Sequence, residues 1–186
     1  NDPLRIYFKS KKNYNAVIYE PIQYYYNKLK QLYQNRDDIL VMKQCVSNNH
    51  GKRKIYFIKP EACDSIKIDN QNNNWLHGLG SFDKKNVENA INLNSFRDEN
   101  YLKNNIISEL VDSFKLKDLI FPKSSVNLLV IDVQGFELDV LLTLSFNEKI
   151  DYIIYEDEDP FSQKSKKIRM LLKEHHYTLI GRLTWL

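Results

Sequence analysis

Four short apolar runs each end in a polar residue that can take part in binding or catalysis. Reading along the chain, the residues that follow these runs are Glu20, Ser47, Asp132 and Glu156. In an open parallel sheet, ligands bind outside the carboxyl ends of the strands. Because three of the four residues are carboxylates, the pattern predicts an acidic ligand-binding edge.

Glu20 has two interpretations that stay open. An acidic residue at the end of a strand can accept hydrogen bonds from both ribose hydroxyls of an adenosine ligand. A carboxylate at this position is equally stabilised by the dipole of the helix that follows. Pro21 fits the start of that helix, because a proline is tolerated in a first turn.

Asp132 and Glu137 lie in the segment 128–141, LLVIDVQGFELDVL. Asp132 can act as a general base, orient a substrate hydroxyl or hold the amino group of a cofactor. It can instead cap the next helix, and Gly135 fits a tight turn there. We favour the functional interpretation for Asp132. For Glu137 we expect either contact with substrate or a surface position stabilised by the helix dipole.

The segment 75–82, WLHGLGSF, is an apolar island in a polar region and suggests a loop folded over a pocket. His77 can serve as a general base near neutral pH or be an ordinary packing residue. Gly80 and Ser81, together with Glu156, are predicted to contact substrate. The G-x-G pattern follows no strand, so phosphate binding is not predicted. The acidic run 156–159 indicates a solvated turn, and no metal site is predicted.

The elements that position these residues alternate between strands and amphipathic helices. That order predicts βαβ units and one mostly parallel sheet with helices on both faces. We expect one domain over 1–186 with an insertion or cover at about 60–119. The predicted helices lie at 3–12, 22–33, from Asp83, at 137–144 and from Ser162; the predicted strands lie at 16–19, 39–46, 54–58, 126–131 and 152–155. The segment 106–119 is ambiguous, with a helix favoured near its end, and 177–186 is rich in β-forming residues.

Composition excludes several classes of protein. The formal net charge is only +3, which does not call for a nucleic-acid partner. Two cysteines and four histidines make neither a disulfide framework nor a zinc pattern, so a cytoplasmic setting is expected. No apolar run reaches the roughly 18 residues that a membrane span needs.

Three segments together resemble the FkbM-like methyltransferases. LLVIDVQGFELDVL is similar to that family's strand-turn-helix signature, and AVIYEPIQYYYNKLKQLY to its strand that ends in Glu-Pro. QCVSNNHGKRKIYF is similar to its strand, Ser-Asn turn and hairpin, and GLGSF to a segment before the signature strand. These matches span most of the chain from Ala16 to about Tyr177.

The resemblance implies a Rossmann-like class I methyltransferase fold, S-adenosylmethionine as cofactor and transfer to a hydroxyl oxygen of a sugar or another small metabolite. By position, it implies that Glu20 and Pro21 hold the ribose side and that Val46 and Ser47 lie against the adenine. Asp132 and Gln134 are then placed near the methionine end and the reacting centre. The family often has Glu where this chain has Gln134.

The resemblance also predicts an opening strand and a glycine-rich loop. A βαβ unit needs roughly 30 residues, yet only 15 residues precede Ala16 and no glycine occurs before Gly51. We therefore expect that strand and loop to be missing, and the chain to be incomplete at both ends. Two rival functions stay open: a non-catalytic methyltransferase-like module that binds a glycan, protein or nucleic acid, and a nucleotide-sugar-binding enzyme.

Overall fold

The structure is a computed structural model, and it describes residues 14–66, 73–93, 98–119, 126–147, 149–157 and 159–181. The helix expected at 3–12 and the residues 182–186 lie outside this part of the chain. Residues 177–181 contain no strand.

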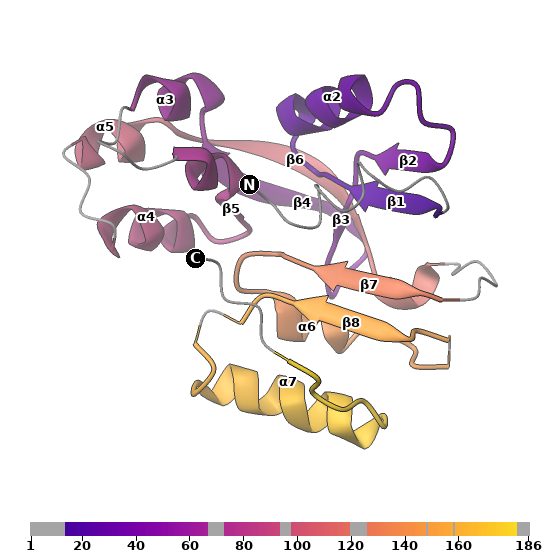
Figure 1. Ribbon diagram of the computed structural model, residues 1–186. Coiled ribbons are helices and arrows are strands. Elements are labelled where there is room, and N and C mark those ends of the chain that lie inside the picture. Colours follow the sequence, from indigo (N-terminus) through magenta and orange to yellow (C-terminus); the bar gives the residue numbers. More distant parts are fainter. Residues whose placement is uncertain are drawn as a thin grey trace.

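The described strands form three separate sheets (Figure 1). The first pairs β1 (Ala16–Tyr19) with β2 (Ile39–Met42) in parallel. The third pairs β7 (Leu128–Ile131) with β8 (Tyr152–Tyr155), also in parallel. The second has the order β3-β6-β4-β5, with bounds Cys45–Val46, Ile106–Phe114, Gly51–Ile58 and Gly80–Ser81.

One mostly parallel sheet was expected, and this is not confirmed. The long β4–β6 pairing is antiparallel over eight residue pairs, and β5 also runs antiparallel to β4. The strand predicted at 39–46 divides between two sheets, because β2 pairs with β1 whereas β3 pairs with β6. The hairpin suggested for 44–57 is wrong, since β6 lies between β3 and β4.

Helices cover these sheets, and several begin where the sequence predicted. They are α2 (Gln23–Leu32), α3 (Pro60–Ser65), α4 (Lys84–Leu93), α5 (Glu99–Asn104), α6 (Glu137–Leu141) and α7 (Gln163–Glu174), with 3-10 turns η1 (Asn73–Gly78) and η2 (Leu116–Asp118). Asp83 accepts from the Lys85 N–H at 2.9 Å and the Ser162 hydroxyl accepts from the Ser165 N–H at 3.1 Å, so both predicted caps are confirmed.

Three hydrophobic clusters hold the layers together. The first lies among α3, η1, α4 and α5 against β4 and centres on Ile58, Leu76 and Ile91. The second joins β7, β8, α6 and α7 around Ile131, Leu141 and Ile168. The third lies between α2 and the β4–β6 pair and contains Ile22, Cys45, Ile55, Phe57 and Val111. The region 60–119, expected as an insertion or cover, thus supplies β6 as well as the covering helices.

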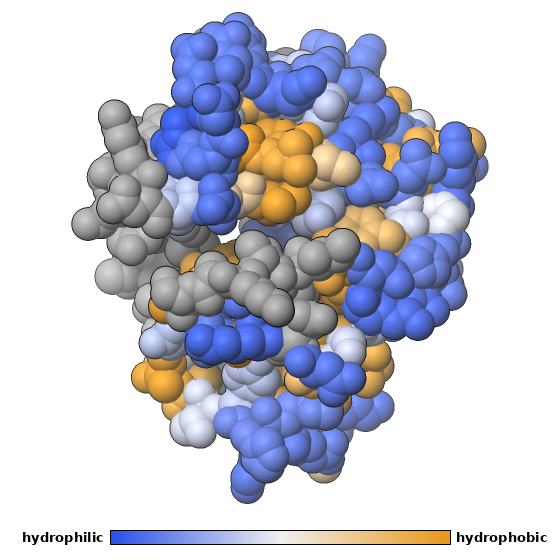
Figure 2. Space-filling model, turned by 90° about the vertical axis from the view of Figure 1, so that its right-hand side faces the viewer, coloured by the Kyte–Doolittle hydropathy of each residue, from blue (hydrophilic) through white to orange (hydrophobic). Residues whose placement is uncertain are grey.

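The two parallel pairs point the same way. In Figure 1 the arrows of β1, β2, β7 and β8 all run in one direction, which puts their carboxyl ends on one side of the molecule. Some of their apolar side chains stay exposed, including Val17 and Leu40 as well as Leu128 and Val130. Figure 2 shows apolar surface among hydrophilic regions on one side of the molecule.

Candidate functional site at the carboxyl ends of the strands

Glu20 begins the turn between β1 and α2. Its backbone N–H continues the pairing with β2 by donating to the Met42 carbonyl at 3.0 Å. One carboxylate oxygen, Oε1, accepts from the Ile22 N–H at 2.8 Å. Among the described residues the other oxygen, Oε2, has no hydrogen-bond partner. The carboxylate therefore ties the turn before α2 and still offers one acceptor oxygen to a ligand.

The environment of Glu20 disfavours its charge. Burial raises the pKa of its carboxyl to about 7, against the opposing effect of the Ile22 N–H bond, and the nearby Glu109 carboxylate raises it further. Near neutral pH the group is thus poised between its charged and neutral forms. A hydrogen-bond donor or cation placed on Oε2 would favour the charged form.

Glu109, from β6, is a residue that sequence reasoning missed. Its two carboxylate oxygens accept from the Gln23 N–H at 3.2 and 3.3 Å, and it pairs with Lys43 at 3.0 Å. It thereby stabilises the positive end of α2. Only the antiparallel pairing of β6 brings it there, and no local pattern around residue 109 indicates that contact.

Asp132 and Glu156, at the ends of β7 and β8, are linked by Gln134. The Gln134 side-chain nitrogen Nε2 donates to Asp132 Oδ1 at 3.0 Å and to Glu156 Oε2 at 3.0 Å. Asp132 is exposed, and its second oxygen has no partner within the described residues. The structure thus brings three of the predicted site residues together, with a neutral amide between two carboxylates.

The turn that carries Gln134 has an unusual backbone. Gln134 has φ 49° and Gly135 has φ 96°, both in the left-handed region. Glycine adopts such a conformation easily, whereas for glutamine it is strained. The Gln134 bonds to both carboxylates help to offset that strain and hold the amide in place.

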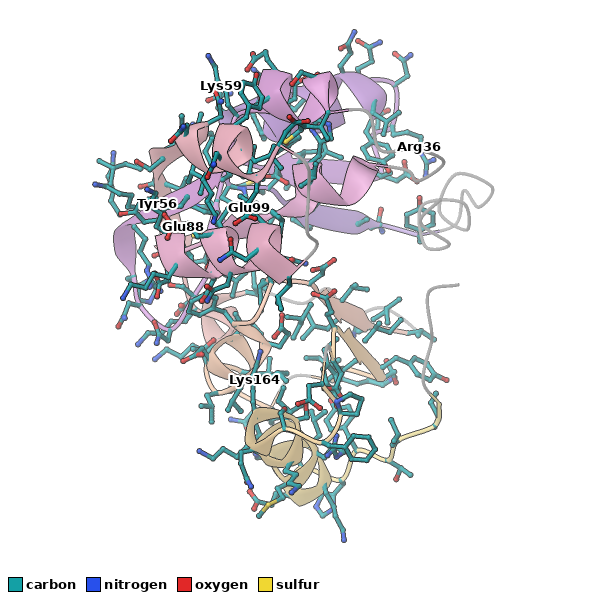
Figure 3. The ribbon with its side chains drawn as sticks, turned by 90° about the vertical axis from the view of Figure 1, so that its left-hand side faces the viewer. Arg36, Tyr56, Lys59, Glu88, Glu99 and Lys164 are labelled. Atoms are coloured by element: carbon teal, nitrogen blue, oxygen red, sulfur yellow. The ribbon has the colours of Figure 1, made fainter. Side chains whose placement is uncertain are left out.

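Glu137 is buried rather than at the surface. Only 2% of its side chain is exposed, its Oε1 accepts from the Gly135 N–H at 2.9 Å, and its Oε2 pairs with Lys164 of α7. Figure 3 shows Lys164 on the side of α7 that faces the rest of the molecule. With both oxygens bound inside the protein, Glu137 fixes the turn and α7, and this structure leaves it no oxygen for a substrate.

Gly80 and Ser81 form β5 and pack the island against the turn after β1. A Cβ on Gly80 would lie 3.4 Å from Ile55 Cδ1 and 3.5 Å from Ile22 Cδ1, at ordinary van der Waals distance, so Gly80 lies close to both side chains. The Ser81 hydroxyl accepts from the Asp83 N–H at 3.2 Å and from Asn86 Nδ2 at 3.3 Å. Both residues thus act within the fold.

His77 connects α3 to α2. Its Nδ1 lies 3.0 Å from the Tyr25 hydroxyl, and its Nε2 lies 3.1 Å from Asp64 Oδ1. Burial raises the pKa of Tyr25 well above its usual range, with smaller contributions from neighbours that include Glu20 and Asp64. Because both ring nitrogens have protein partners, His77 positions Tyr25 and is not free to take a substrate proton in this structure.

The island also reaches the turn after β7. The Phe82 ring lies edge to face against the Phe136 ring, with centroids 5.4 Å apart. Gly80, at the other end of the same short segment, lies close to the Ile22 side chain. Residues 80–82 therefore bridge the end of β1 and the end of β7, the two places where the sequence predicted functional carboxylates.

Val46 ends β3, at the edge of the four-stranded sheet, and Ser47 follows it. The Ser47 hydroxyl donates to the Asn49 carbonyl at 2.8 Å and accepts from the Asn49 N–H at 3.2 Å. It therefore shapes the turn between β3 and β4. Val46 pairs with Phe114 of β6 and packs against the cluster under β7. Pro21 is half-buried in the turn that separates Glu20 from α2.

Every described helix is too short or not apolar enough to cross a membrane.

Comparisons with known proteins identify the family of the chain. Neither the curated proteins nor the solved structures contain a match to the chain. Residues 3–179 match a family model described as the methyltransferase FkbM domain, which confirms the resemblance seen in the sequence. The chain therefore belongs to the FkbM methyltransferase family, whose fold is the class I methyltransferase fold.

Proposed function

We propose that this methyltransferase uses S-adenosylmethionine and methylates a hydroxyl oxygen of a sugar or another small metabolite. Family membership supports the cofactor class, because methyltransferases of this kind generally use it. The observation that carries the proposal is that the island lies against both strand ends, with Gly80 close to the Ile22 side chain and the Phe82 ring against the Phe136 ring. It supports one shared site for Glu20 and Asp132.

The residues present fit such a cofactor. Glu20 keeps one acceptor oxygen, Oε2, for the ribose hydroxyls, and hydroxyls are donors that a carboxylate accepts well. In this proposal Val46 and the Ser47 turn lie against the adenine, and Pro21 shapes the ribose side. Since the Ser47 hydroxyl is bound to Asn49, that residue contributes its backbone and the form of the turn.

Asp132 is the proposed proton acceptor. S-adenosylmethionine supplies, when bound, the methyl group that an acceptor oxygen attacks. The exposed Oδ2 of Asp132 takes the hydroxyl proton of the acceptor, while Gln134 holds Oδ1 through its amide and fixes the direction of the carboxylate. His77 is a weaker candidate for this role, because Tyr25 and Asp64 occupy both of its ring nitrogens.

Glu156 and the island complete the acceptor side. The Glu156 carboxylate, held by Gln134, is placed to accept a further hydroxyl of a sugar-like acceptor. Phe82 and Phe136, whose rings meet between the island and the Gln134 turn, provide an aromatic surface, and such surfaces suit the apolar faces of small ligands.

The test compares the variants Asp132→Ala and Asp132→Asn with the wild-type enzyme. We expect kcat to fall by about 10²- to 10⁴-fold in both variants, with the affinity for S-adenosylmethionine changed much less. Unchanged turnover would remove Asp132 from the mechanism. Calorimetry with S-adenosylmethionine and with nucleotide sugars addresses the rival functions: binding of nucleotide sugars alone, or of neither, would overturn the proposed function.

A further inference from the structure

Arg53 of β4 carries a positive charge beside the proposed site. Its guanidinium carbon lies 3.9 Å from the centre of the Phe82 ring, which is a cation–π contact. Phe82 in turn contacts Phe136 at the end of the turn that carries Gln134. Arg53 therefore stands one aromatic ring away from the segment that presents Asp132.

The strand places Arg53 on the side of the sheet that faces the site. Side chains alternate along a strand, so Arg53 shares a face with Ile55 and Phe57, which pack beneath α2. Ile55 also lies next to Gly80. The neighbouring Lys52 and Lys54 are exposed and lie on the opposite face.

A second observation places Arg53 near the end of β3. Arg53 Nη1 donates to Asn48 Oδ1 at 3.3 Å, and Asn48 directly follows the Val46–Ser47 corner. The guanidinium thus lies between the β3 corner, proposed to face the adenine, and the turn after β7.

The guanidinium has little to bind within the protein. Among the described residues its one hydrogen bond goes from Nη1 to Asn48 Oδ1 at 3.3 Å. Across the part of the chain that the structure describes, no carboxylate lies within ion-pair distance of it. A half-buried arginine has five N–H donors in a planar fork that fits carboxylates and phosphates, and most of this fork is unused.

We propose that Arg53 binds an anionic group, a carboxylate or phosphate, of a molecule held at the carboxyl ends of β1 and β7. The inference rests on the proposed function for the identity of that site. Two sources offer such a group: the amino-acid carboxylate of S-adenosylmethionine, or an acidic substituent of the methyl acceptor. Phe82 holds the guanidinium plane in place for this contact.

The test uses the full-length enzyme and the variants Arg53→Met, Arg53→Lys and Lys54→Met. Methionine keeps an apolar stem on Phe82 while removing the charge. Lys54→Met is the matched control, because it removes a positive charge from the same strand on the opposite face. Thermal unfolding identifies any variant that is not folded, and Arg53→Gln, which also removes the charge, then serves in place of Arg53→Met. Arg53→Lys keeps the charge without the planar fork and should retain part of the anion affinity.

Three ligands separate the sources: S-adenosylmethionine, 5′-methylthioadenosine, which lacks the amino-acid carboxylate, and inorganic phosphate. If the cofactor carboxylate is bound, Arg53→Met weakens S-adenosylmethionine by about 10- to 100-fold and leaves 5′-methylthioadenosine unchanged. If the acceptor supplies the anion, Arg53→Met leaves both cofactor affinities unchanged. It then abolishes phosphate binding to the cofactor-loaded enzyme, which is measured by ³¹P line broadening.

The inference is overturned when Arg53→Met leaves both S-adenosylmethionine and phosphate binding as in the wild type. It is also overturned when S-adenosylmethionine and 5′-methylthioadenosine weaken equally, because that result indicates a general disturbance of the site. A wild-type enzyme that binds no S-adenosylmethionine contradicts the proposed function instead, and the phosphate measurement on the unloaded protein then tests Arg53 by itself.

Discussion

The Phe82 ring meets the Phe136 ring edge to face, with the ring planes at 72° and the centroids 5.4 Å apart. Phe82 follows β5, and Phe136 directly precedes α6. The contact thus joins two segments that follow strands of different sheets and lie 54 residues apart in sequence. This ring contact links the island to the turn that carries Gln134.

A double-mutant cycle of Phe82→Leu and Phe136→Leu tests this link. Each leucine keeps apolar volume but removes the ring geometry. We expect a coupling of about 0.5–1.5 kcal/mol in the free energy of unfolding, measured with urea, because edge-to-face pairs contribute that much beyond area burial. A coupling near zero would mean that the two rings act independently. Leu93→Ala, at a site with 84% exposure, is a neutral control.

Glu20 gives a pH dependence to ligand binding. With a pKa of about 7 in the free protein, only about a tenth of the Glu20 side chains are ionised at pH 6, whereas most are at pH 8. Since the ribose hydroxyls need a carboxylate acceptor, we expect S-adenosylmethionine affinity to rise about tenfold between these values. Calorimetry at pH 6 and 8 measures it. Glu20→Gln should bind S-adenosylmethionine more weakly and with the same affinity at both pH values. If the affinity of this variant rises with pH as much as that of the wild type, Glu20 does not bind the ribose hydroxyls.

The same group affects stability in the opposite direction. Its pKa in the folded state is raised from the usual 4.5, so the neutral form favours folding. That contribution is fully present below about pH 4.5 and is lost as the pH rises through about 7. The ligand-free wild type should therefore lose stability relative to Glu20→Gln over this window. The loss is on the order of 3 kcal/mol at most, and urea unfolding at pH 4.5, 6 and 8 follows it.

Local patterns predicted the elements that end in the candidate residues. Short apolar runs identified β1, β7 and β8, and the caps at Asp83 and Ser162 identified the starts of α4 and α7. These features depend on residues close in sequence, so a pattern can reveal them.

The long strand β6 was missed for a physical reason. In the sequence IISELVDSF, Ile106, Ile107, Leu110 and Val111 recur at helical spacing. The strand forms because β4 pairs with it along its length, which is a contact between distant segments. Such long-range contacts also produce the Glu109 cap on α2, the bridge by Gln134 and the placement of Arg53. For that reason no local pattern predicts them.

The link between Tyr25 and His77 predicts a difference between two conservative variants. Tyr25→Phe removes the hydroxyl and leaves the half-buried His77 Nδ1 unpaired, so the free energy of unfolding should fall by about 1 kcal/mol. Asp64→Asn should cost less, because the Asp64 side chain is 61% exposed and exposed ion pairs contribute little. Urea unfolding at pH 8 compares them. If Asp64→Asn lowers the free energy of unfolding more than Tyr25→Phe does, the hydrogen bond between Tyr25 and His77 is not the stronger of the two contacts.

Gln134→Glu should destabilise the end of β7 and β8 at alkaline pH. The substitution places a third carboxylate within hydrogen-bond distance of Asp132 and Glu156, where the amide now donates to both. Mutual repulsion raises the pKa values of the group, so stability is retained at low pH and lost as the pH rises. We expect a loss of about 1–3 kcal/mol at pH 8 and a smaller loss at pH 5. Gln134→Ala is the control, since it removes the bridge without adding charge, and a deficit independent of pH in Gln134→Glu would show that repulsion is not the cause.

The buried Glu137 should make Lys164 far more important for stability than its exposure suggests. The Lys164 side chain is 36% exposed, whereas Glu137 is only 2% exposed, so Lys164→Met leaves a charge in the interior without its counter-ion. We expect a loss of about 3 kcal/mol in the free energy of unfolding. The Gly135 N–H bond to Glu137 remains and limits the loss.

The double variant Glu137→Gln with Lys164→Met separates charge from packing. Glutamine keeps the shape of the glutamate side chain and removes the buried charge, so the double variant should be more stable than Lys164→Met alone. If the two are equally unstable, the loss comes from packing of the lysine stem. Lys166→Met, at an exposed position on the same helix, is the matched control and should change stability by less than about 0.5 kcal/mol. Because Glu137 also ties Gly135, the single variant should in addition loosen the Gln134 turn and weaken S-adenosylmethionine binding, and the double variant should restore part of that binding.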